Sequence, residues 1–122
     1  MIMVDSPKVL VVEDEALLLF SISDELKDAG FEVLEAVDAQ QALVLLERNP
    51  DVKAIFTDIN MPGSMDGLAL SRYVRDRWPP IKIVVTSGKH RPSDRDLPAE
   101  RLFVPKPYTT DGVIAALTAA LR

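Results

Sequence analysis

The stretch VLVVEDE, residues 9–15, joins a short apolar run to three consecutive carboxylates. The run Val9–Val12 is rich in β-branched residues and is too short to form a helix. Such a run is typical of a strand that is buried on both faces of a parallel sheet. The acidic residues that follow it predict a strand that ends at a polar edge of the sheet.

Similar apolar runs recur along the chain at residues 54–56, 81–85 and 102–104. A further segment, residues 31–36, mixes charged residues into the pattern, which is typical of an edge strand. Five strands are therefore expected, and four of them have the composition of buried parallel strands.

Helical patterns lie between these strands. The first places Leu19, Ile22, Leu26 and Ala29 on one face and ends at Gly30. The second begins at Asp38, with Gln41 three residues later as in a capping box, and stops at residues 49–50. The third is capped by Asp66 and places Leu70 and Val74 on one face. The last begins at Thr109 or Thr110, with Ile114, Leu117 and Leu121 on one stripe.

Strands and helices alternate along the chain, which predicts a doubly wound α/β domain with a parallel sheet and helices on both faces. One segment breaks the alternation. Between Val85 and Leu102 the residues offer almost no apolar face and include Pro92 and Pro98. We therefore expect the fourth helix to be shortened or lost.

The composition limits the classes of function. The 122 residues carry a net charge of −5 and contain no cysteine, which excludes disulfides and thiolate metal sites. No basic cluster indicates nucleic-acid binding, and no apolar run approaches the roughly 20 residues of a membrane span. This composition leads us to expect a cytoplasmic protein. Because the chain starts at a Met and holds every segment of the pattern, we expect one free-standing domain over residues 1–122.

Polar residues follow four of the expected strands. In a doubly wound sheet, ligands bind beyond the carboxyl ends of the strands, so these residues are expected to converge. They are Glu13, Asp14 and Glu15 after the first strand, Asp58 after the third, Thr86 and Ser87 after the fourth, and Lys106 between two prolines after the fifth.

Clustered carboxylates repel one another unless a cation lies between them. Oxygen ligands without histidine or cysteine favour Mg²⁺ over zinc. A lysine and a hydroxyl across the site suit an anion with several oxygens. These are the parts of a phosphoryl-transfer site, here with a carboxylate as the nucleophile.

The motifs in their order along the chain resemble the receiver domain of bacterial response regulators. The resemblance covers nearly the whole chain and rests on residues 9–15, 58–62, 66–67, 86–88 and 106–107. It implies a flavodoxin-like strand order, 2-1-3-4-5. It also implies that Asp58 accepts a phosphoryl group from the phosphohistidine of a sensor histidine kinase or a histidine phosphotransfer protein.

The resemblance further implies the roles of the surrounding residues. Mg²⁺ would be bound by Glu13 or Asp14, by Asp58 and by the backbone carbonyl of Asn60. Thr86 and Lys106 would bind the phosphoryl oxygens, and Thr86 with Phe103 would form the switch that reports phosphorylation. The isomer of the bond between Lys106 and Pro107 is left open, as is the downstream partner.

Other interpretations remain at this point. Asp58 can cap a turn, Lys106 can be a surface lysine, Phe103 can be a core aromatic residue, and Ser87 offers a hydroxyl that competes with Thr86. The chain can be a receiver domain excised from a hybrid histidine kinase, or a receiver-like module that is never phosphorylated. A Mg²⁺-dependent aspartyl phosphohydrolase would place a second acid two residues after its nucleophile, where this chain has Asn60. We therefore expect a phosphoacceptor signalling domain and not an enzyme.

Overall fold

The computed structural model describes residues 6–61, 63, 65–88 and 101–122. Within these ranges the chain forms five strands and four helices. In chain order they are β1 (Lys8–Val12), α1 (Ala16–Asp28), β2 (Glu32–Ala36), α2 (Ala39–Arg48), β3 (Val52–Asp58), α3 (Gly67–Arg77), β4 (Lys82–Ser87), β5 (Arg101–Pro105) and α4 (Thr110–Leu121).

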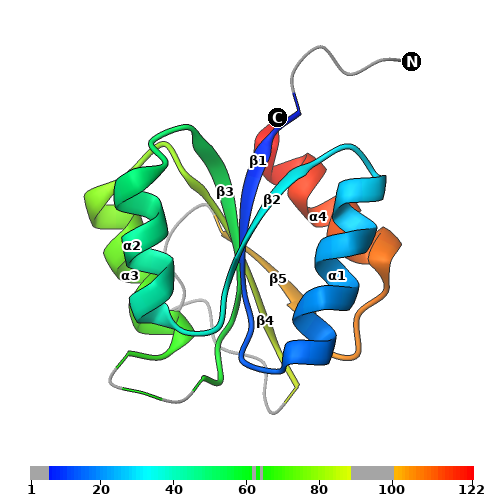
Figure 1. The fold of residues 1–122 in the computed structure, drawn as a ribbon, viewed down its shortest axis with the longest axis horizontal. Helices are drawn as coiled ribbons and strands as arrows, with labels where there is room; N and C mark the ends of the chain where they lie inside the picture. The colour runs from blue at the N-terminus through cyan, green and yellow to red at the C-terminus, as the bar shows by residue number, and fades with distance from the viewer. Residues whose placement is uncertain (1–5, 62, 64, 89–100) are drawn as a thin grey trace.

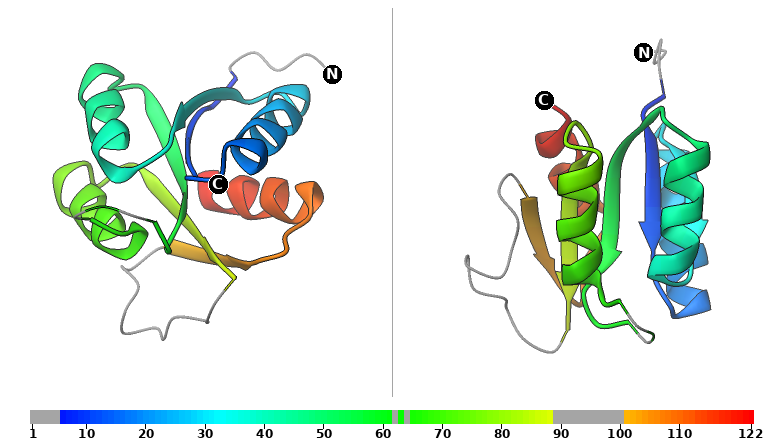
Figure 2. Two further views of the ribbon diagram at one scale, coloured as in Figure 1. Left: turned by 60° about the horizontal axis from the view of Figure 1, so that its bottom comes forward. Right: turned by 90° about the vertical axis from the view of Figure 1, so that its left-hand side faces the viewer.

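The strands form one parallel sheet in the order β2-β1-β3-β4-β5, which confirms the predicted architecture. Helices α1 and α4 cover one face of the sheet, and α2 and α3 cover the other (Figure 1). The additional views show the same three layers (Figure 2). Because all strands run in one direction, their carboxyl ends lie together at one edge of the sheet, the lower edge in Figure 1.

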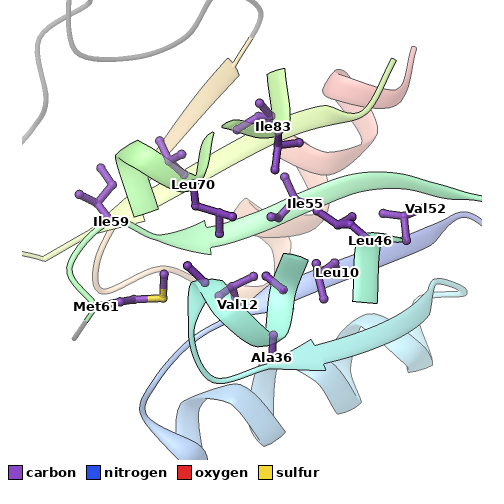
Figure 3. Close-up of a cluster of buried hydrophobic side chains, with 14 residues drawn as sticks. Leu10, Val12, Ala36, Leu46, Val52, Ile55, Ile59, Met61, Leu70 and Ile83 are labelled. Carbon is purple, nitrogen blue, oxygen red and sulfur yellow. The ribbon is translucent and has the colours of Figure 1, made fainter. Parts of the chain in front are cut away.

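The two faces of the sheet build two hydrophobic clusters. In β1, Leu10 and Val12 pack into the cluster beneath α2 and α3, whereas Val9 and Val11 pack into the cluster beneath α1 and α4. Figure 3 shows the first of these clusters, in which Ile55 of β3 lies between neighbouring strands and helices. Since successive strand residues face opposite sides, a strand covered on both faces must be apolar throughout. This explains the continuous apolar runs in the sequence.

Side-chain caps set the beginnings of three helices at the predicted residues. Asp38 caps α2 by accepting a hydrogen bond of 2.8 Å from the backbone N–H of Gln41. Asp66 and Thr109 cap α3 and α4 in the same manner. Such caps satisfy backbone donors that the helix itself leaves unpaired.

Details of two helical faces differ from the prediction. Ala29 is the exposed C-cap of α1 and does not extend the buried face of Leu19, Ile22 and Leu26. In α4, Val113 and Leu117 are the buried residues, whereas Ile114 and Leu121 are partly buried and pack against the same cluster.

The predicted shortening or loss of the helix before β5 falls on residues 89–100 and lies outside the described residues. Among the helices that the structure does describe, none combines the length and apolar character needed to cross a membrane.

Helix α3 approaches the end of β3 so closely that its first residue must be glycine. A Cβ atom on Gly67 would overlap the backbone carbonyl oxygen of Asp58 and lie 2.7 Å from the Cα of Ile59. The backbone N–H of Gly67 donates to the carbonyl of Ile59 at 2.9 Å, and the buried Ser71 hydroxyl donates to the carbonyl of Gly67 at 2.7 Å. These contacts hold the main chain that carries Asp58.

A Gly67→Ala substitution should therefore push α3 and β3 apart. We expect the free energy of unfolding to fall by about 1–3 kcal/mol, as measured by urea denaturation. Gly112→Ala is the matched control, since Gly112 also lies in the first turn of a helix. Its added Cβ would meet only the Thr109 hydroxyl, at 3.1 Å, and a shift of a few tenths of an ångström in this capping group would relieve the contact. Equal losses in the two variants would contradict the proposed packing constraint.

Candidate functional site

Asp58 is the last residue of β3 and is only 5% exposed. The strand register places it opposite Thr86 of β4. On the other side, Val12 of β1 pairs with Thr57, so Glu13 follows at the level of Asp58. Three strand ends that are distant in sequence therefore meet, as the positions of the polar residues predicted.

Lys106, directly after β5, connects two of these strand ends. Its Nζ atom donates a hydrogen bond of 2.8 Å to Oδ2 of Asp58 and another of 2.9 Å to Oε1 of Glu13. Both carboxylates are buried, and Glu13 is 2% exposed. The bond between Lys106 and Pro107 is cis.

The shared lysine and the burial act in opposite directions on the charges. Burial raises the pKa of Glu13 and the charge of Asp58 adds to this, although the hydrogen bond from Lys106 works against it. Burial alone would lower the pKa of Lys106, but hydrogen bonds to Asp58 and Glu13 outweigh burial and raise that pKa. Lys106 therefore remains an ammonium and compensates part of the negative charge around it.

A third carboxylate completes an acidic cluster. One oxygen each from Glu13, Asp14 and Asp58 lies within 4.8 Å of the others, and Asp14 is exposed to solvent. When all three are ionised, the single charge of Lys106 leaves two negative charges uncompensated. One divalent cation would balance this excess, and an all-oxygen donor set with an open, solvent-facing side suits Mg²⁺, which retains several water ligands. The residues present therefore fit the predicted metal.

Asn60 and Ser87 border the same carboxylate. The backbone N–H of Asn60 donates to Oδ1 of Asp58 at 3.0 Å, so both oxygens of Asp58 have donors. The side chain of Asn60 is held separately, because the Ser87 hydroxyl donates to its Oδ1 at 2.6 Å. Asp58 is thus fixed in one orientation without being closed off from the acidic cluster.

The two hydroxyls at the end of β4 differ in their surroundings. Ser87 is bonded to Asn60, whereas the Thr86 hydroxyl is buried and has no hydrogen-bond partner among the described residues. Phe103 lies in β5 opposite Val85, one residue before Thr86, and packs against the cluster beneath α2 and α3. The predicted roles of Thr86 and Phe103 in a switch stay predictions.

Sequence reasoning overlooked Tyr108 at the margin of this site. Its ring packs edge-on against Phe56, with ring centroids 5.4 Å apart. Burial, followed by the charge of Glu13, raises the pKa of Tyr108 to about 12, so the phenol remains neutral. Together with Leu18, Gly88, Lys106 and Pro107, Tyr108 lines an open pocket of about 380 Å³. Its position directly after the Lys106-Pro107 motif was the available signal in the sequence.

Comparison with known proteins agrees with this geometry. The family model described as "Response regulator receiver domain" matches residues 9–118, which include every residue of the acidic cluster and Lys106. The chain belongs to the response regulator receiver domain family. The receiver domain is similar to the transcriptional regulatory protein PrrA of Mycobacterium tuberculosis, with 36% identity over 98% of this chain and 52% of the relative.

A second relative is the putative response regulator NtrX-like of Rickettsia conorii, 32% identical over 92% of this chain and 24% of the relative. The receiver domain thus spans about half, or a quarter, of the length of these relatives. Among solved structures, a response regulator receiver protein from Sinorhizobium medicae matches with a TM-score of 0.87 and 27% identity, covering 98% of this chain and 97% of the other. The chemotaxis response regulator CheY4 of Vibrio cholerae matches with a TM-score of 0.85 and 26% identity, covering 96% and 100% of the two chains.

Replacing Lys106 by Met should destabilise the protein, because the buried carboxylates of Glu13 and Asp58 then lack a cation between them. In metal-free buffer at about pH 7.5 we expect the free energy of unfolding to fall by about 3 kcal/mol, because Glu13 and Asp58 lose their shared cation. The raised pKa of Glu13 means that folding favours its protonated form, so this group's contribution to stability is present at low pH and is lost as pH rises through the folded-state pKa.

Because the pKa of Glu13 should rise further in Lys106→Met, the loss relative to the parent protein should shrink at about pH 5. Urea denaturation at both pH values checks this. Lys53→Met, which removes an exposed lysine of β3, is the control and should change little. A loss that is independent of pH would contradict the shared-cation explanation.

Proposed function

We propose that this receiver domain accepts a phosphoryl group on Asp58 from the phosphohistidine of a sensor histidine kinase or a histidine phosphotransfer protein, with Mg²⁺ bound beside it. One observation carries this proposal: both oxygens of a buried Asp58 are oriented by donors, while two further carboxylates lie next to it. Receiver domains act in signalling with such kinases and phosphotransfer proteins.

The transfer needs no covalent rearrangement within the protein other than at Asp58. A carboxylate oxygen of Asp58 attacks phosphorus, the bond from phosphorus to the histidine nitrogen breaks, and its electron pair remains on the imidazole, which takes up a proton. The hydrogen bonds from Lys106 and from the backbone of Asn60 hold the attacking carboxylate in place. This orientation lowers the entropy cost of the step.

Glu13 or Asp14, Asp58 and the backbone carbonyl of Asn60 are the proposed metal ligands. Bound Mg²⁺ would neutralise charge on the transferring phosphoryl group. Asp14 is the exposed member of the cluster and Glu13 is already engaged by Lys106, so Asp14 is the better placed of the two for direct binding.

Lys106 and Thr86 are the proposed binders of the new phosphoryl oxygens. The Thr86 hydroxyl lies in the strand register opposite Asp58 and has no competing partner among the described residues. An incoming phosphoryl oxygen would supply that partner, and the movement of Thr86 would reach Phe103 on the adjacent strand.

The signal is proposed to leave the domain through protein contacts. A hydrolase is less well supported, because the carboxamide of Asn60 occupies the position where a second acid would transfer a proton. An origin within a larger protein is compatible with the comparisons, since the receiver domain of the hybrid histidine kinase CckA matches with 28% identity and a TM-score of 0.81, covering 94% of this chain and 99% of the other. The cytoplasmic location stays a prediction.

The proposal is tested by incubation with acetyl phosphate and Mg²⁺, followed by intact mass measurement. We expect one phosphoryl adduct on the parent protein and none on Asp58→Asn. Asp14→Asn should require a higher Mg²⁺ concentration, whereas Asp24→Asn, which changes an exposed aspartate of α1, should behave as the parent does.

An adduct that survives in Asp58→Asn would place the chemistry on another residue. Absence of an adduct on the parent protein would favour the module that is never phosphorylated. Turnover of an external phosphate ester would favour the hydrolase.

Thr86→Val tests the switch separately from the chemistry. Since valine has nearly the same shape and removes a buried hydroxyl without a partner, the free energy of unfolding should rise by about 1 kcal/mol. The response to beryllium fluoride, a mimic of the aspartyl phosphate, should at the same time become smaller at the Phe103 ring, as measured by NMR.

Ser23→Ala is the matched control, because it removes the other buried hydroxyl without a partner among the described residues. It should retain the full response at Phe103. A full response in Thr86→Val would contradict the role of the hydroxyl.

A further inference from the structure

Ser87 and Asn60 form a side-chain pair beside Asp58 that the steps above do not use. Ser87 is the last residue of β4 and is 3% exposed, and its hydroxyl donates to Oδ1 of Asn60 at 2.6 Å. Asn60 lies two residues after Asp58, and its backbone N–H is bonded to Oδ1 of that residue. Asn60 is therefore held at two points, by its main chain on Asp58 and by its side chain on Ser87.

The hydrogen bond selects one of two orientations of the carboxamide. The oxygen of an asparagine side chain only accepts hydrogen bonds, and its nitrogen only donates them. A hydroxyl that donates to the oxygen turns this acceptor toward β4 and leaves the NH₂ group as the half without a hydrogen-bond partner among the described residues. Without the hydroxyl, a rotation of about 180° would exchange the two halves.

This orientation matters for loss of the phosphoryl group, an argument that rests on the proposed function. In hydrolysis, a water oxygen attacks phosphorus, the bond from phosphorus to the Asp58 oxygen breaks, and its electron pair returns to the carboxylate. The water releases a proton, and inorganic phosphate leaves. Attack is faster when a nearby acceptor orients the water and receives its hydrogen bond.

We propose that Ser87 is a positioning residue that acts through Asn60 and lengthens the lifetime of the aspartyl phosphate. By holding Oδ1 of Asn60 toward β4, the Ser87 hydroxyl keeps this acceptor from turning toward the attacking water.

The contacts give less support to a purely structural role for Ser87 in aligning the ends of β3 and β4. The ends of β3 and β4 are already joined by the pairing of Asp58 with Thr86 and by a hydrogen bond of 2.8 Å from the backbone N–H of Ile59 to the carbonyl of Thr86. The strand ends therefore remain aligned without the side-chain bond between Ser87 and Asn60.

A double-mutant cycle tests the inference. Four proteins are compared: the parent, Ser87→Ala, Asn60→Ala and the double variant. Each is phosphorylated with acetyl phosphate and Mg²⁺, the acetyl phosphate is removed, and the decay of the adduct is measured by intact mass. We expect Ser87→Ala to shorten the lifetime of the adduct by about 5-fold and to have almost no effect in the Asn60→Ala background. Ser23→Ala, a buried serine of α1 outside the site, should leave the lifetime unchanged.

A second readout uses the metal-free, unphosphorylated protein. The ¹⁵N relaxation of the Asn60 side-chain NH₂ group should show a restrained group in the parent protein and a more mobile one in Ser87→Ala. Equal restraint in both proteins would overturn the orienting role, whatever happens on phosphorylation.

The outcomes separate the inference from the function on which it rests. An adduct whose lifetime is equal in the parent and in Ser87→Ala, or is shortened by the same factor with and without Asn60, overturns the inference alone. If the parent protein forms no adduct, the proposed function is contradicted. The proposed effect of Ser87 on the adduct lifetime is then contradicted as well.

Discussion

The ammonium of Lys106 lies between two buried carboxylates, Glu13 and Asp58, and joins the ends of β1, β3 and β5. Burying an unpaired carboxylate costs several kcal/mol, so this lysine stabilises both acids in their positions. Because the lysine is shared, the cluster retains an excess of negative charge once Asp14 is included. That excess makes the site receptive to a divalent cation, and the proposed chemistry depends on it.

The sheet and helix α3 position Asp58 accurately relative to Lys106 and Thr86. A parallel sheet brings its carboxyl ends to one edge, and the register sets Asp58 opposite Thr86. The first residue of α3 contacts the main chain of Asp58 closely enough that only glycine is accommodated. The side chain that reacts is thus carried by a backbone held from both sides, by a neighbouring strand and by a helix. A displacement of either element would alter the position of the nucleophile.

The hydroxyls of the last two residues of β4 differ in their hydrogen bonding. Ser87 is engaged by Asn60, whereas Thr86 keeps a buried hydroxyl without a partner among the described residues. Unpaired buried hydroxyls reduce stability, so Thr86 makes the resting state slightly less stable than it could be. A phosphoryl oxygen on Asp58 would supply the missing partner. The Thr86 hydroxyl therefore lowers the stability of the unphosphorylated domain and would also respond to phosphorylation.

The sequence by itself determined the alternation of strands and helices, the caps at Asp38, Asp66 and Thr109, and the polar strand ends. These features depend on local patterns, since a strand covered on both faces must be apolar and a helix start needs an acceptor. Only the tertiary structure decided which acid is buried against Lys106, which hydroxyl at the end of β4 is already engaged, and why residue 67 must be glycine. Each of these depends on contacts between segments far apart in the chain, where neither spacing nor composition sets the distance between atoms.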